Sequence, residues 1–104
     1  MNICTFTGYL TDDPVISMVG DVVLAEFTVA VHSYRRTKST GEKGRSTTYI
    51  NCQAWHTGAE TIERFAIAGT KITINASARN GHHDRRSLVF RVNEFDLCNA
   101  NNED

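Results

Sequence analysis

The sequence is poor in proline, cysteine and long hydrophobic runs. Its only proline, Pro14, leaves no proline-rich linker, and no apolar run approaches the ~18 residues of a membrane-spanning helix. Its three cysteines, Cys4, Cys52 and Cys98, are widely spaced and form no C-x-x-C pair, which favours reduced thiols over a disulfide framework or a zinc site. The N-terminal segment lacks the basic and apolar regions of a signal peptide, so we expect a cytoplasmic protein.

An excess of charge of either sign is also lacking. Eleven Lys and Arg residues stand against twelve Asp and Glu residues, for a net charge of -1. This balance excludes a strongly basic tail and an acidic disordered chain, but a net sum can hide a local basic cluster. With 104 residues and 40% hydrophobic residues, the chain can bury one core. We expect one domain over residues 1–98 and a short polar, acidic end over residues 99–104.

Five segments alternate between apolar and polar residues with the period of two that is typical of half-buried strands. They are residues 2–10, 22–34, 47–55, 70–79 and 87–97. In the second segment this alternation predicts that Leu24 is exposed, and in the last it predicts that Leu88 faces the core. The apolar phase changes near Asn93 and Glu94, which predicts a bulge there.

Residues 57–68 have the spacing of a helix instead. Three apolar residues at i, i+3 and i+4 share one helix face: Ile62, Phe65 and Ala66. Thr57, with Glu60 three residues later, predicts a capping box at the helix start, and Gly69 predicts a left-handed cap after its end. The order is three strands, one short helix and two strands. This order predicts an all-β fold, a five-stranded antiparallel OB-fold barrel with the helix between strands three and four.

Four large aromatic residues lie on the polar side of these strands. They are Tyr9, Tyr34, Tyr49 and Trp55. Such rings are either buried against the helix, a loop or another subunit, or they form a platform on which bases stack. Stacking of a base on an aromatic ring contributes roughly 1–3 kcal/mol.

Nine of the eleven cationic residues fall in two stretches beside the aromatic strands. The first contains Arg35, Arg36, Lys38, Lys43 and Arg45, and the second contains Arg79, Arg85, Arg86 and Arg91. One explanation is that the two stretches are solvated loop tips that only keep the protein soluble. This explains the charges but not the aromatic rings beside them. Cations interleaved with aromatic rings favour a groove that follows the phosphates of a single nucleic-acid strand.

The sequence contains no recognisable catalytic or metal-binding motif. Its four histidines lack the spacing of a metal site, and neither a P-loop, a G-x-G-x-x-G fingerprint nor a G-x-S-x-G elbow is present. We therefore expect a protein that is not an enzyme and that needs neither a metal nor a cofactor.

Several short segments follow one another at characteristic spacings. They are GYLTDDP at 8–14, AEFTVAV at 25–31, TGE at 40–42, YINCQAW at 49–55, AE at 59–60 and AGTKITI at 68–74. Their order and spacing resemble the bacterial-type single-stranded DNA-binding (SSB) proteins over nearly the whole chain. The resemblance implies an OB-fold that coats single-stranded DNA in replication, recombination and repair, without a cofactor and usually as a homotetramer.

Residue by residue, the resemblance implies base stacking for Tyr34, Tyr49 and Trp55 and a basic role for Arg79. His82 and His83 stand where the family often has an aromatic residue, so His83, like Tyr9, is a further candidate contact to single-stranded DNA. The end of the chain is acidic but has no aromatic tip, as expected of a tail-less or phage-encoded member, and this departure puts recruitment of replication proteins in doubt.

Two functions stay open at this point. The first is a single-strand coat, and the alternative is a primosomal replication-restart adaptor of the same fold that acts mainly through protein partners. Exposed aromatic residues favour the first, and aromatic residues buried between subunits favour the second. In both cases we expect a homo-oligomer, a tetramer or a dimer, with the first strand at the subunit contact. We expect it in the bacterial cytoplasm, in the nucleoid or in a phage-infected cell, and not at a membrane.

Overall fold

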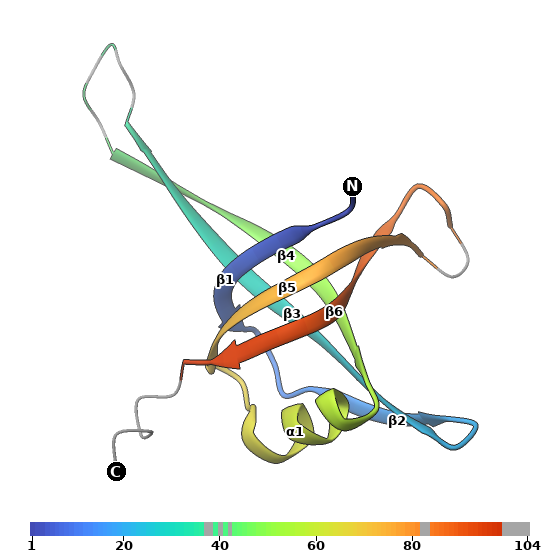
Figure 1. Cartoon of the computed structure of the whole chain (residues 1–104). Helices are drawn as coiled ribbons and strands as arrows, with labels where there is room; N and C mark the ends of the chain where they lie inside the picture. Colours follow the sequence, from blue (N-terminus) through green and yellow to red (C-terminus); the bar gives the residue numbers. More distant parts are fainter. Residues whose placement is uncertain (37–38, 40, 42, 82–83, 99–104) are drawn as a thin grey trace.

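The computed structural model describes the whole chain except residues 37–38, 40, 42, 82–83 and 99–104. Its elements are β1 (Cys4–Leu10), β2 (Val15–Val19), β3 (Val22–Arg36), β4 (Lys43–Trp55), α1 (Thr57–Phe65), β5 (Lys71–Asn80) and β6 (Leu88–Leu97). Figure 1 shows the strands wrapped around one another, with α1 at the end of the barrel near β2. None of the described residues forms a helix that is long and apolar enough to cross a membrane.

The sheet closes on itself into a barrel. The strand order is β1-β5-β6-β4-β3-β2, and β1 also pairs with β3, which joins the two sides. Most pairs are antiparallel, as expected, but β4 and β6 pair in parallel at Cys52↔Phe90 and Gln53↔Arg91. Five strands therefore form a closed barrel with a single helix, which confirms the predicted OB-fold.

A sixth strand, β2, was not predicted. Among the described residues it pairs only with β3, and Gly20, with a φ of 63°, begins the two-residue turn that joins Val19 to Val22. Four of its five residues are exposed, so the strand has no alternating apolar face for the sequence pattern to reveal. Because of β2, the helix follows the fourth strand of the chain rather than the third.

The core lies inside the barrel and under α1. Its largest fully buried side chains are Leu10, Ile62, Ile72, Ile74, Val29 and Cys52. Burial raises the pKa of the Cys52 thiol to about 12, because the charged form would lose its solvation. The thiol therefore stays uncharged at neutral pH, and Cys52 packs as a small apolar core residue.

The structure corrects the predicted helix in three respects. It ends at Phe65, whose side chain is 54% exposed, while Ala59 and Ile62 are its buried residues. The N-cap is His56, which makes no side-chain cap hydrogen bond, so the predicted capping box at Thr57 is wrong. Gly69 has a φ of 89° but lies beyond the helix, where its N–H donates to the carbonyl of Leu10.

Two predictions of side-chain burial are wrong and the predicted bulge is confirmed. Leu24 is only 6% exposed, because Trp55 stands directly opposite it on β4. Leu88 is 52% exposed, since it begins β6 at the rim of the barrel, beside the β5–β6 loop. The bulge lies at Asn93, because the β5–β6 register shifts between the pairs that Asn75 and Ala76 form with Glu94 and Val92.

Candidate nucleic-acid interface

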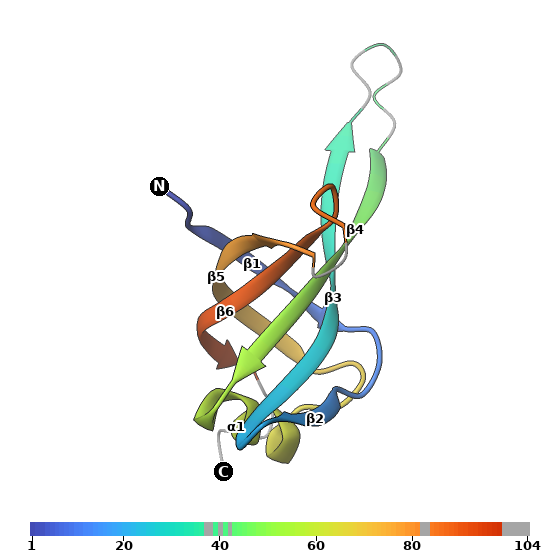
Figure 2. The ribbon, with the colours of Figure 1, turned by 90° about the vertical axis from the view of Figure 1, so that its right-hand side faces the viewer.

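The polar sides of β3 and β4 form one outer surface, which we call the β3–β4 face. Its cross-strand pairs are Leu24↔Trp55, Glu26↔Gln53, Thr28↔Asn51, Ala30↔Tyr49, His32↔Thr47 and Tyr34↔Arg45. Figure 2 shows these two strands running side by side from α1 to the hairpin end. Residues two apart on a strand point to the same side, so the register places all three predicted stacking residues on this one face.

The three predicted stacking residues differ in how open they are. Tyr34 is 77% exposed and Tyr49 is 65% exposed, whereas Trp55 is half-buried. Within the described part of the chain, neither tyrosine is covered by the helix or by a loop. Burial against the helix or a loop, one of the two explanations that the sequence allowed for these rings, therefore does not apply to the two tyrosines.

Trp55 lies against one of the predicted cations. The guanidinium carbon of Arg91 is 5.8 Å from the centroid of the Trp55 ring, within the range of a cation–π interaction. The parallel pairing of β4 with β6 creates this contact, because it sets Arg91 opposite Gln53. One predicted stacking ring and one predicted phosphate contact therefore stand together at this end of the face.

Tyr9 extends the face onto β1. Ala30 pairs with Tyr49 on one side and with Tyr9 on the other, so a small side chain separates two tyrosines. The Tyr9 ring lies 6.2 Å from that of His32, and His32 Nδ1 lies 3.0 Å from the Thr47 hydroxyl. His32 was not among the predicted site residues, although its place in the alternation of β3 puts it on this face.

The remaining predicted cations lie on β3, β4 and β5 and in the β5–β6 loop. Arg45 is opposite Tyr34, Arg79 is opposite Val89 on β6, and Arg85 and Arg86 are exposed in the β5–β6 loop. The backbones of three others pair at the ends of β3 and β4, namely Arg35, Arg36 and Lys43. Lys38 and His83 lie outside the described residues.

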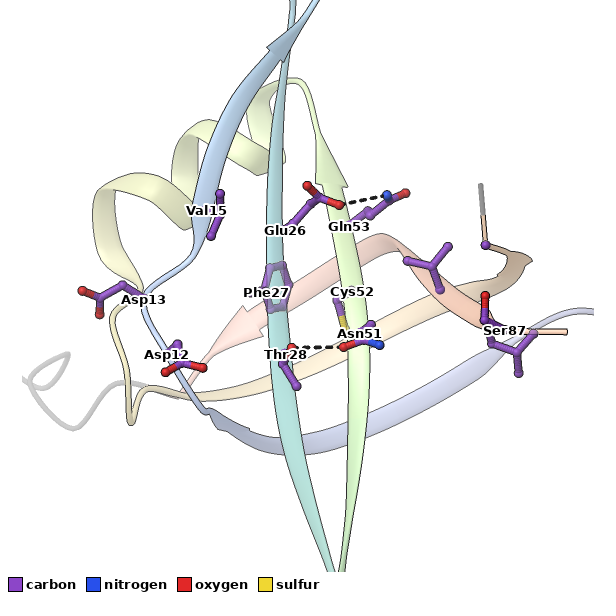
Figure 3. A pocket seen from close by; sticks show the side chains of 13 residues that line it. Asp12, Asp13, Val15, Glu26, Phe27, Thr28, Asn51, Cys52, Gln53 and Ser87 are labelled. Atoms are coloured by element: carbon purple, nitrogen blue, oxygen red, sulfur yellow. Dashed lines mark hydrogen bonds between the residues drawn. The ribbon is translucent and has the colours of Figure 1, made fainter. Parts of the chain in front are cut away.

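A groove of about 560 Å³ lies on the β3–β4 face (Figure 3). Among the described residues none of the predicted cations lines it, so it is not the basic groove that the sequence favoured. Its polar floor consists of two cross-strand pairs. Gln53 Nε2 donates to Glu26 Oε2 at 3.4 Å, and the Thr28 hydroxyl donates to Asn51 Oδ1 at 3.1 Å. Asn51 and Gln53 alternate with Tyr49 and Trp55, and that alternation was the available signal.

The two walls of the groove come from different ends of the chain. Asp12, Asp13 and Val15 form one wall, and residues 81 and 87–89 form the other. The Asp13 carboxylate is held in place because it accepts a hydrogen bond of 2.8 Å from the N–H of Ala68. Among the described residues, no group of three or more His, Cys, Asp or Glu side chains has the arrangement of a metal site.

A closed five-stranded barrel with one helix is the OB-fold, and on this one the aromatic rings and the Arg91 guanidinium share one outer face. The chain belongs to the single-strand binding protein family, whose family model matches residues 1–97. A search of curated protein sequences found no match.

Solved structures of other proteins have the same fold. The second single-stranded DNA-binding protein of Mycobacterium smegmatis is 20% identical, with a TM-score of 0.76 over 93% of this chain and 88% of that chain. The small single-stranded DNA-binding protein of Streptomyces coelicolor is 11% identical, with a TM-score of 0.74 over 91% and 90%. The protein priB of Ralstonia solanacearum is 14% identical, with a TM-score of 0.73 over 93% and 98%.

Proposed function

We propose that this protein binds and protects single-stranded DNA, largely without sequence preference and without catalysis, in replication, recombination and repair. Bases stack on Tyr34, Tyr49 and Trp55, and phosphates contact the surrounding Arg and Lys side chains. The observation that carries the proposal is the exposure of two tyrosines on the same face as the Trp55–Arg91 pair. Membership of the single-strand binding protein family supports it.

The fluorescence of Trp55 tests this proposal, because Trp55 is the only tryptophan. We expect oligo-dT to quench its emission, since a stacked base contacts the indole ring directly. Duplex DNA of equal length is the control and is expected to quench far less, because its bases are not free to stack. An emission spectrum that saturating oligo-dT leaves unchanged would remove Trp55 from the interface.

A second candidate function is that of a replication-restart adaptor that acts mainly through protein partners. The observation in its favour is the likeness of the fold to the protein priB, which covers 93% of this chain. The open tyrosines favour the single-strand coat, because an adaptor that acts through proteins alone has no need of a stacking surface. Replication proteins remain candidate partners under either function.

We also propose that the protein is a homo-oligomer, a tetramer in the first instance, with β1 at the subunit contact. One edge of β1 pairs with β5, but its other edge pairs with β3 only at Tyr9 and Leu10. The described part of the chain therefore leaves the backbone groups of Cys4–Thr7 on that edge without a strand, and such edges are usually paired or covered. Ile3, next to this edge, is 63% exposed.

Sedimentation equilibrium at micromolar protein concentration tests the assembly. We expect a mass that is four times that of one chain. A stable dimer would keep the β1 contact and favour the adaptor, whereas a single monomeric species would contradict the proposed assembly.

A further inference from the structure

Charge is separated across the groove rather than spread evenly. One row of the sheet runs from Glu26 on β3, through Gln53 on β4, to Arg91 on β6. Asp12 and Asp13 lie on the Glu26 side of the groove, as Figure 3 shows. On the other side, Arg79 of β5 stands opposite Val89 of β6, which lines the groove. The two neutral amides of Asn51 and Gln53 stand between the acidic and the basic sides.

This separation restricts how a single strand can lie on the face. Each phosphate carries a negative charge, so the acidic side repels the sugar-phosphate backbone and the basic side attracts it. The same strand has to bring a base onto Trp55, which stands between Gln53 and the helix. The backbone therefore follows the β6–β5 side, and the base edges point across the amides toward Glu26.

We propose that the groove contacts the edges of the bases, with the carboxylate of Glu26 accepting hydrogen bonds from base amino groups while the phosphates lie along Arg91 and Arg79. This inference rests on the proposed binding of single-stranded DNA and deepens it. It adds a moderate preference for bases that carry an amino group, while binding stays largely independent of the order of the bases.

The hydrogen bonds on the groove floor support this role. A carboxylate at neutral pH only accepts hydrogen bonds, and Glu26 uses one oxygen to accept from Gln53. Among the described residues, no donor occupies its second oxygen. Asn51 accepts from Thr28 through its Oδ1, so its amide nitrogen can still donate. The floor thus offers an acceptor beside a donor.

A comparison of cytosine with thymine tests this arrangement, because the two bases differ at the edge that would meet Glu26. Cytosine presents an amino donor at N4, whereas thymine presents the acceptor O4 at the same place. Both are single-ring pyrimidines, so their stacking on Trp55 differs little. A carboxylate favours cytosine in this comparison, and a neutral side chain that both donates and accepts does not.

The test compares the affinity for oligo-dC with that for oligo-dT in the wild-type chain and in Glu26→Gln. We expect the ratio of dC to dT affinity to fall by about five-fold in the variant, because a charge-assisted hydrogen bond is replaced by a weaker neutral one. Glu63→Gln is the matched control, because Glu63 is exposed on α1, away from the groove residues, and the charge change is identical. Its ratio is expected to equal that of the wild type.

The course of the phosphates is tested by salt. Arg91→Gln is expected to reduce the slope of log affinity against log salt by about 0.7, the value for one phosphate of a single strand, and Glu26→Gln is expected to leave it unchanged. If Glu26→Gln raises both affinities equally, the carboxylate only repels DNA and the inference is wrong. If the wild type binds neither oligonucleotide, the proposed function itself fails.

Discussion

Replacing Trp55 by Ala is expected to weaken the binding of single-stranded DNA by about 1–3 kcal/mol. The ring is half-buried at one end of the β3–β4 face, and Arg91 lies 5.8 Å from its centroid, so the loss removes a stacking surface and releases the guanidinium. Trp55→Phe keeps a smaller aromatic surface and is expected to lose less. The anisotropy of a labelled dT oligonucleotide measures both variants without the need for a tryptophan signal.

Phe65→Ala provides a matched control for this experiment. Phe65 is a 54% exposed aromatic residue, and its ring lies 5.6 Å from the guanidinium carbon of Arg64, as in the Trp55–Arg91 pair. It stands on α1, outside the β3–β4 face, so its removal is expected to leave the affinity unchanged. Equal losses in the two variants would show that stacking on Trp55 is not responsible for the effect.

Replacing Gly8 by Ala is expected to lower the free energy of unfolding by about 1–3 kcal/mol, as is typical of overpacking. A Cβ atom there would overlap the carbonyl oxygen of Ala30 and lie 2.8 Å from Val29 Cγ1. The next residues of β1, Tyr9 and Leu10, are those that pair with β3 and close the barrel. The backbones of β1 and β3 approach closely at this point, so neither strand can move aside without opening the barrel. Urea denaturation measures the change.

Gly58→Ala makes the same chemical change where there is space for it. The new Cβ would lie 3.6 Å from Phe95 Cε1, an ordinary contact, and Gly58 lies in α1, where Ala is the better helix former. This variant is therefore expected to gain up to about 1 kcal/mol of stability. A Gly8→Ala protein as stable as Gly58→Ala would contradict the role of close approach in barrel closure.

All strands but β2, and the helix α1, were predictable because their signals are local. The alternation in residues 22–34 depends only on which side chains face the core, and the structure places Ala25, Phe27 and Val29 there. Phe65 shows the limit of such a signal. Helical spacing put it on the face of Ile62, but the helix ends at Phe65 and its side chain turns outward.

The parts of the candidate site that depend on distant segments were not predictable. The rings of Tyr34, Tyr49 and Trp55 share a face because each lies in the polar phase of its own strand, so the sequence pattern sufficed. The contact between Trp55 and Arg91 needs the parallel pairing of β4 with β6, which no local pattern encodes. The groove needs, in addition, the turn that carries Asp12 and Asp13.

The part of the β3–β4 hairpin far from the barrel is held by fewer contacts than the part within the barrel. Figures 1 and 2 show it projecting past the barrel, and among the described residues β3 pairs beyond Ala30 only with β4. Val31 still packs against the core, but Ser33, Tyr34, Arg45 and Ser46 farther along the hairpin are exposed. A two-stranded ribbon that no core supports is marginally stable, so we expect the amide hydrogens of this outer part to exchange with solvent through local opening rather than through global unfolding. Trp55, in contrast, is held in place by the closed barrel before single-stranded DNA binds. A base that stacks on Tyr34 must also offset the entropy lost when the ribbon is ordered, so equal contacts contribute less affinity there than at Trp55.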